Sequence, residues 1–154
     1  MKPSRRAVIA AAASSGLAGL PEVARAAGWT LPPERGIREI EHTWIPMRDG
    51  VRLSARLFLP EGQGARPAVL EYIPYRKRDG YRSHDSAWGR QMASRGFAYV
   101  RVDVRGSGDS EGVLTDEYAE PELADGEAVI DWISRQPWCS GAVGMRGLSW
   151  GGIN

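Results

Sequence analysis

One serine near the end of the sequence stands in a pattern that supports nucleophilic chemistry. Residues 147–151 read Gly-Leu-Ser-Trp-Gly, a Gly-x-Ser-x-Gly motif, and they follow the short apolar run 142–145. Where this motif joins a strand to a helix it forms a nucleophile elbow, a strained turn that holds the serine hydroxyl above the sheet. Glycines flank the serine because strand and helix crowd the turn. The pattern predicts Ser149 as a nucleophile, with the Trp150 N–H placed to donate to an oxyanion.

The sequence begins its folded part with a predicted hairpin. Residues 39–46 alternate loosely between apolar and polar, Asp49-Gly50 supplies a turn, and residues 51–59 alternate strictly. Strict alternation indicates a strand with one buried face, so Arg52, Ser54 and Arg56 are expected on the exposed face. The pair predicts an antiparallel hairpin at one edge of a sheet.

The rest of the chain alternates between short apolar runs and helical stretches. Residues 68–73, 97–102 and 142–145 are typical of interior strands of a parallel sheet, covered on both faces. Residues 86–95 predict a first helix. A second helix is expected from Pro121, in its first turn, to Gln136-Pro137, which stops it. Its apolar positions repeat at helical spacing: Leu123, Gly126, Ile130 and Ile133. This order of elements predicts a mixed sheet of the α/β class, with no internal repeat.

Several segments together resemble a known family. The sequence is similar to the Xaa-Pro dipeptidyl-peptidase-like, or CocE/NonD (cocaine esterase), family of α/β-hydrolases. The matching segments occur in the family's order and cover nearly all of residues 40–154: 47–53 (MRDGVRL), 73–77 (IPYRK), 102–112 (VDVRGSGDSEG), 136–138 (QPW) and 147–152 (GLSWGG).

The resemblance implies the roles of three residues. Ser149 would be the nucleophile, and the Trp150 amide together with the hydroxyl of Tyr75 would form the oxyanion hole. The residues alone favour a different role for Tyr75, that of an aromatic residue that packs and hydrogen-bonds locally at the rim of the sheet. The family's acid and histidine follow the serine in the chain. Residues 28–154 are therefore expected to be the N-terminal part of an α/β-hydrolase catalytic domain, ending just after the elbow.

Other residues that could do chemistry are better explained by structure. His42 is expected to pack within the hairpin. His84 is expected in a polar loop over 79–86, and contacts substrate at most, because α/β-hydrolases order their triad serine, acid, histidine. Asp103 and Asp109 flank a glycine-rich loop whose spacing, Gly-x-Gly-x-x-x-Gly, does not fit dinucleotide binding. That loop is expected to be structural. No cofactor or metal is expected, because no group of residues has metal-ligand spacing.

Composition and the N-terminal segment bear on location and partners. Twenty Lys and Arg against 19 Asp and Glu give a net charge of +1, which gives no reason to expect nucleic acid as a partner. The single cysteine, Cys139, excludes an intrachain disulfide and is expected to be structural. Residues 1–27 combine a basic start with Arg5-Arg6, a weakly apolar middle and an Ala-rich end, which predicts a twin-arginine signal peptide and export. No ordinary membrane span is expected.

These features favour a serine hydrolase that cleaves ester or amide bonds of a small-molecule or peptide substrate. Esterase and Xaa-Pro dipeptidyl-peptidase activities both fit, and the lack of an evident acidic cluster for a substrate amine favours an esterase. The alternative is a non-catalytic α/β binding module that retains the elbow sequence. The chain by itself is expected to be inactive and to fold poorly.

Overall fold

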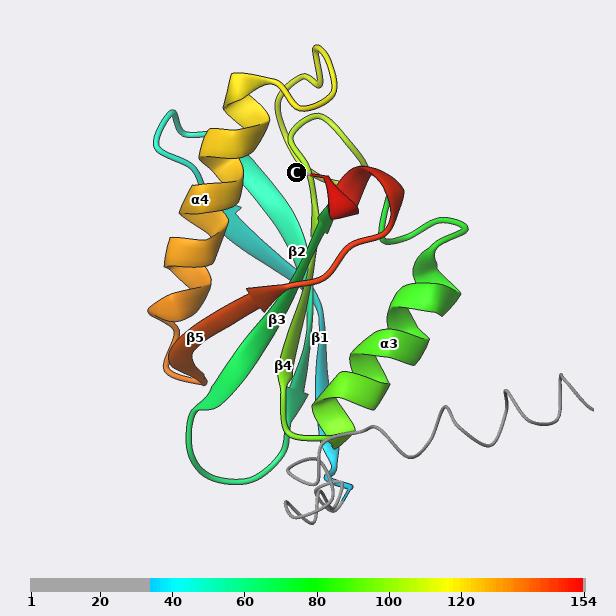
Figure 1. The fold of residues 1–154 in the computed structure, drawn as a ribbon, viewed down its shortest axis with the longest axis vertical. Coiled ribbons are helices and arrows are strands. Elements are labelled where there is room, and N and C mark those ends of the chain that lie inside the picture. The colour runs from blue at the N-terminus through cyan, green and yellow to red at the C-terminus, as the bar shows by residue number, and fades with distance from the viewer. Residues whose placement is uncertain (1–33, 154) are drawn as a thin grey trace, which may run out of the picture. The chain divides into compact units, whose positions relative to one another are not determined.

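A mixed five-stranded sheet lies at the centre of the computed structural model, which describes residues 34–153 (Figure 1). The strands are β1 (Ile37–Pro46), β2 (Arg52–Pro60), β3 (Arg66–Ile73), β4 (Ala98–Asp103) and β5 (Cys139–Met145). Their order across the sheet is β1-β2-β4-β3-β5. β1 pairs antiparallel with β2 and β2 antiparallel with β4, whereas β3 is parallel to both β4 and β5. The predicted edge hairpin and the α/β class are confirmed.

Two helices cover opposite faces of this sheet (Figure 1). Helix α3 (Arg82–Ser94) packs on β4 and β2, and helix α4 (Glu120–Ser134) packs on β5 and β3. The core under α4 is large and aliphatic, and Val129 and Ile133 of the helix are fully buried in it. The apolar core under α3 is small, with Phe58, Ala93 and Tyr99 at its centre. Most of the buried charges described below also lie near α3.

Helix α3 begins four residues before the predicted start at residue 86, so the prediction that His84 lies in a loop is wrong. The first turn is polar in sequence, which hid it from a search for apolar periodicity. Its side chains find partners elsewhere in the fold: Arg82 donates to Glu41 of β1 at 2.8 and 2.9 Å, and Asp85 pairs with Arg101 of β4 at 3.0 Å.

Helix α4 has the predicted Pro121 in its first turn and ends at Ser134, just before Gln136-Pro137. Its buried face agrees with the prediction at Gly126 and Ile133 but not at Leu123. Leu123 is 50% exposed, whereas the acidic side chains of Glu122 and Asp125 are buried. Asp125 is stabilised by two hydrogen bonds of 2.7 Å from Arg105.

The predicted exposed face of β2 is also buried. Only Arg52 of the three polar residues is exposed; Ser54 and Arg56 are buried, and Arg56 lies over the Phe58 ring. Arg56 tolerates this because Glu39 and Glu41 of β1 and Ser86 of α3 accept hydrogen bonds from its guanidinium group. The alternation was real, but partners distant in sequence cover the polar face.

Among the described residues, strand β5 differs from β3 and β4 in its exposure. β4 is buried along its whole length and β3 along most of it, as expected for interior strands. β5 instead lies at the end of the strand order and is mostly exposed.

Residues 1–27, the predicted signal peptide, lie outside the described residues. Among residues 34–153, no helix is long and apolar enough to cross a membrane.

Candidate active site

The turn after β5 has the geometry of a nucleophile elbow. Ser149 is exposed, adopts φ of 57°, and begins the short 3-10 helix η1 (Ser149–Gly152). A Cβ on Gly147 would lie 1.5 Å from the carbonyl oxygen of Gly151, and a Cβ on Gly151 would lie 2.0 Å from Cγ2 of Ile73. Both glycines are therefore required by close approach, as the motif predicts.

Tyr75 and Trp150 converge beside this turn. Tyr75 follows β3, the neighbour of β5, and the carboxyl ends of parallel strands meet at the same edge of a sheet. The Trp150 backbone N–H donates to the Tyr75 hydroxyl oxygen at 3.4 Å. The Tyr75 ring also packs on Tyr81, with 5.0 Å between ring centroids. A carbonyl oxygen that faces both the amide and the hydroxyl would receive a hydrogen bond from each.

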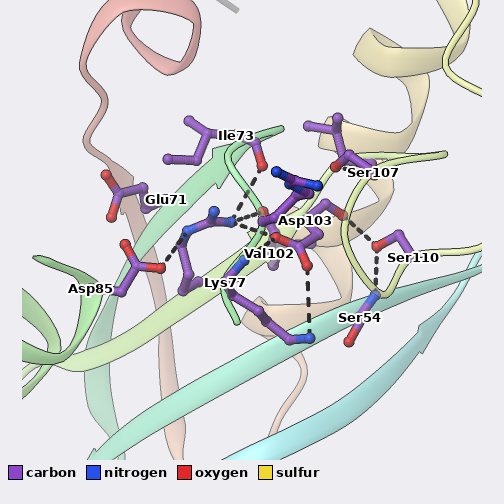
Figure 2. A network of polar contacts seen from close by, with 12 residues as sticks. Ser54, Glu71, Ile73, Lys77, Asp85, Val102, Asp103, Ser107 and Ser110 are labelled. Atoms are coloured by element: carbon purple, nitrogen blue, oxygen red, sulfur yellow. Dashed lines mark hydrogen bonds and ion pairs between the residues drawn. The ribbon is translucent and has the colours of Figure 1, made fainter. Parts of the chain in front are cut away.

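A buried network holds the turn that carries Tyr75 (Figure 2). Arg76 adopts φ of 51°, and the next residue, Lys77, donates its backbone N–H to Asp103 at 2.9 Å. The Lys77 ammonium pairs with Asp109 and lies 3.7 Å from Asp103. The other oxygen of Asp103 accepts the backbone N–H of Asp109 at 3.2 Å. The 103–112 loop is thus structural, as predicted, and it fixes the position of Tyr75.

Arg101 joins this network to helix α3. Its guanidinium group pairs with Asp85 at 3.0 Å and with Asp103 at 3.2 Å, and it donates to the carbonyl oxygens of Ile73 and Val102 (Figure 2). All three charged side chains are fully buried. Burial raises the pKa of Asp85, and the charge of Arg101 opposes that rise.

The elbow is attached to the same face of the sheet through Arg146, which lies between β5 and Gly147. Arg146 donates to Glu71 of β3 at 3.1 Å and to the Tyr99 hydroxyl at 3.2 Å. Its guanidinium group also lies 4.3 Å from the centroid of a Trp88 ring. Tyr99 donates to Glu71, and burial raises the pKa of this phenol, so it stays a neutral donor.

One group of side chains in residues 34–153 has atoms close enough to hold a metal ion. Ligand atoms of Glu71, His84 and Asp85 lie within 4.8 Å of one another. Arg146 contacts Glu71, and Arg101 contacts Asp85, so each carboxylate already faces a positive charge. The arrangement is that of an ion-pair network under the Tyr75 turn.

Both histidines have partners within the fold. His42 packs edge-on against Trp44, with 4.5 Å between ring centroids, and its Nδ1 lies 3.0 Å from the Ser54 hydroxyl. Burial lowers its pKa, as expected for a packing residue. His84 lies between the rings of Tyr81 and Trp88, at 5.1 and 6.3 Å, and Tyr81 separates it from Tyr75.

Two buried acids that contact the elbow segment are absent from the residues predicted for the site. Glu71 binds Arg146 from the α3 face of the sheet, and Glu122 accepts the Trp150 indole N–H at 2.6 Å from the α4 side. Glu71 could have been identified from the sequence, because it is the one charged residue in the apolar run 68–73. A charge in such a run requires a buried partner. Glu122 had a weaker signal, as one of several acids near the predicted start of α4.

The sheet, its two covering helices and the elbow define an α/β-hydrolase fold. A sequence model of the X-Pro dipeptidyl-peptidase (S15) family matches residues 49–154, and the chain belongs to this family. Solved structures agree: a CocE/NonD family hydrolase from Staphylococcus aureus has a TM-score of 0.65 at 25% identity, over 74% of this chain and 24% of that one.

Curated relatives give higher sequence identity. A protein named as a serine esterase in Mycobacterium bovis is 38% identical over 80% of this chain and 22% of its own. Cocaine esterase from Rhodococcus sp. is 39% identical over 71% of this chain and 19% of its own. The chain therefore spans about a fifth of the length of the curated relatives it matches.

Proposed function

We propose that the protein is a serine hydrolase that cleaves ester or amide bonds by acyl transfer. Ser149 attacks the substrate carbonyl, and the Trp150 N–H and Tyr75 hydroxyl stabilise the oxyanion that forms. The observation that carries the proposal is the approach of the Trp150 amide to the Tyr75 hydroxyl, at 3.4 Å, beside a serine with φ of 57°. The two donors, 75 positions apart in the sequence, are brought to one point where the reaction needs both of them.

We expect the general base to be a histidine that follows Ser149 in the chain. In α/β-hydrolases the acid and histidine come after the nucleophile, whereas His42 and His84 both precede it. Both are also engaged elsewhere, with Ser54 and with the aromatic rings around α3. The histidine would take the Ser149 hydroxyl proton and return it to the leaving group.

Esters are the proposed substrate class. Support comes from the relatives named as esterases, at 38% and 39% identity. The family description points to X-Pro peptides as the second candidate. A dipeptidyl-peptidase must bind a free amine, and the acids near the elbow, Glu71 and Glu122, are instead buried and bonded to Arg146 and Trp150. We therefore place esters first.

Covalent labelling tests the proposal in the full-length protein. A fluorophosphonate probe should label Ser149 rapidly, and Ser149→Ala should abolish both labelling and hydrolysis of aryl esters. Ser140→Ala, at an exposed serine of β5, is the matched control and should change neither. A protein that no activated-serine probe labels would favour the binding module, whereas labelling that survives Ser149→Ala would assign the nucleophile to another residue. Comparing aryl esters with X-Pro anilides would then separate the two substrate classes.

We also propose export by the twin-arginine route, supported by the Ser-Arg-Arg start and weakly apolar stretch of residues 1–27. Changing Arg5 and Arg6 to Lys should leave precursor in the cytoplasm, seen by fractionation and immunoblotting. Normal export of the Lys-Lys variant would contradict this route.

A further inference from the structure

We propose that Glu122 is a positioning residue for the oxyanion hole, acting through the Trp150 side chain. This inference rests on the proposed function, because it assigns a purpose to the orientation of the Trp150 amide. Trp150 has two polar groups, and each has a partner. Its backbone N–H faces Tyr75 and its indole N–H donates to Glu122 at 2.6 Å.

The Glu122 carboxylate is built to hold two segments at once. Its side chain is buried in the first turn of α4, where the helix N-terminus favours negative charge. One oxygen accepts the indole of Trp150, and the other accepts the backbone N–H of Tyr118 at 3.0 Å. A buried carboxylate with charge-assisted bonds on both oxygens has little freedom to move.

The segment that carries Tyr118 also contacts Trp150. Tyr118 adopts φ of 56°, a conformation that is strained for a residue with a side chain, and its ring lies 5.4 Å from the Trp150 ring. Such strain persists only where surrounding structure enforces it. The indole is therefore confined by a ring contact and by a hydrogen bond, both of which depend on Glu122.

Confining the indole matters because Trp150 follows the strained Ser149. The acceptor of the Trp150 N–H is the Tyr75 hydroxyl and not a group of the short η1 helix. Anchoring the side chain limits rotation of the residue about its backbone. We infer that loss of the Glu122 contact lets the amide turn from the oxyanion position.

The test uses the full-length protein and two variants that break the same hydrogen bond from opposite ends. Glu122→Leu removes the acceptor, and Trp150→Phe removes the donor while keeping the backbone amide. Each should lower kcat by about tenfold or more, toward the ~10² that a misplacement of about 1 Å can cost, with little change in KM. The affinity of an aryl boronic acid, a transition-state analogue, should fall in parallel. The double variant should lose no more than the worse single variant, because one interaction is lost.

Two further variants separate positioning from stability. Val129→Ala removes side-chain contacts in the core under α4, two turns along the helix from Glu122; it should lower Tm and leave kcat unchanged. Glu122→Gln keeps one acceptor oxygen and should recover part of the activity lost in Glu122→Leu. If Glu122→Leu does not fold, Trp150→Phe still tests the contact.

Unchanged kcat in folded Trp150→Phe would overturn the inference, as would equal losses of kcat in Glu122→Leu and Val129→Ala. Either result is distinct from failure of the proposed function, which would show as activity or labelling that does not require Ser149.

Discussion

Two hydrogen-bond donors from distant parts of the sequence meet beside Ser149, and the tyrosine is the one that a point substitution can remove. Tyr75→Phe keeps the ring and its packing on Tyr81 but deletes the hydroxyl. Loss of one oxyanion donor typically costs about 10²–10³ in kcat, so we expect a loss in this range in the full-length protein. KM and Tm should stay close to the wild-type values, because the hydroxyl does not hold the fold. Steady-state kinetics with an aryl ester and thermal melting measure both.

A loss of kcat smaller than about threefold would indicate a packing role for Tyr75, since the loss of an oxyanion donor reduces kcat by much more than this. Tyr81→Phe is the matched control, because it removes a neighbouring phenol that has no contact with the Trp150 amide. It should leave kcat within about twofold of wild type.

The glycine before Ser149 is a second residue whose substitution has a defined result. In Gly147→Ala the new methyl group would lie 1.5 Å from a backbone oxygen, which no side-chain movement relieves. We expect destabilisation of more than the ~1–3 kcal/mol that overpacking usually costs, with loss of Ser149 labelling. Gly144→Ala, three residues earlier and with open space around it, should change Tm and labelling little. Equal Tm values for the two variants would show that the elbow is looser than the structure indicates.

Sequence patterns predicted those residues whose identity is required by close contacts with neighbouring atoms. Gly147 and Gly151 are required by contacts within 2.0 Å, and such requirements leave a readable motif. Glu122 left no comparable trace. A buried acid is recognised by its partners, Trp150 and Tyr118, and these are separated from it along the chain or lie in a loop of irregular structure.

Among the elements, β1 and α3 are joined by an ion pair whose response to pH can be measured. Hydrogen bonds from Arg82 lower the pKa of Glu41 from 4.5 to about 2. The folded state therefore binds this proton less tightly than the unfolded chain does. The stabilising contribution of Glu41 is complete above about pH 4.5 and is lost as the pH falls toward 2.

We expect Glu41→Gln to lower Tm at neutral pH and the difference from wild type to shrink as the pH falls from 4.5 to 2. The two side chains are 43% and 56% exposed, so the effect should be below about 1 kcal/mol and should weaken in high salt. Glu127→Gln, at an exposed acid of α4, is the control. A Tm difference that does not depend on pH would show that Glu41 acts through packing and not through charge.

Apolar patterns in the sequence predicted the strands and helices correctly only where hydrophobic side chains alone determine which face is buried. The apolar runs that form β3 and β4 could be identified as strands without knowing which residues they contact. The polar face of β2 and the first turn of α3 were misjudged because Arg56, Arg82 and Asp85 are paired with residues 16 to 41 positions away. Sequence periodicity reports hydrophobicity, whereas these elements are completed by charge pairing across the fold.

At the scale of the whole molecule, the two faces of the sheet are built differently. Under α4 lies a continuous aliphatic core, whereas beside α3 the chain buries the charged side chains of Glu71, Asp85 and Arg101. Removing one member of such a network leaves an uncompensated charge and is strongly destabilising. The network lies under the Tyr75 turn and reaches the elbow through Arg146, so the polar layer holds both sides of the proposed oxyanion hole.

The open side of β5 leads to a prediction for residues 28–154 expressed alone. β5 pairs with β3 on one side, and among the described residues no strand covers its other side. Exposed apolar side chains surround it, with Met145 43%, Leu123 50% and Leu148 56% exposed. An uncovered strand edge with apolar neighbours is a template for association between chains. We therefore expect this polypeptide to self-associate at micromolar concentrations, and to hydrolyse no aryl ester in a Ser149-dependent way, because both of its histidines are engaged away from the elbow.

Charge placed on that strand should oppose the association. Ala142→Lys puts a lysine at an exposed position of β5, and Ala65→Lys makes the same change of net charge in the exposed loop before β3. If the edge is responsible, sedimentation velocity will show less association for Ala142→Lys than for Ala65→Lys, because a lysine blocks pairing only where strands meet. Equal sedimentation of the two variants would assign the association to another surface. A monomer with Ser149-dependent turnover would contradict both parts of the prediction and would point to His84, two aromatic rings from the elbow, as the base.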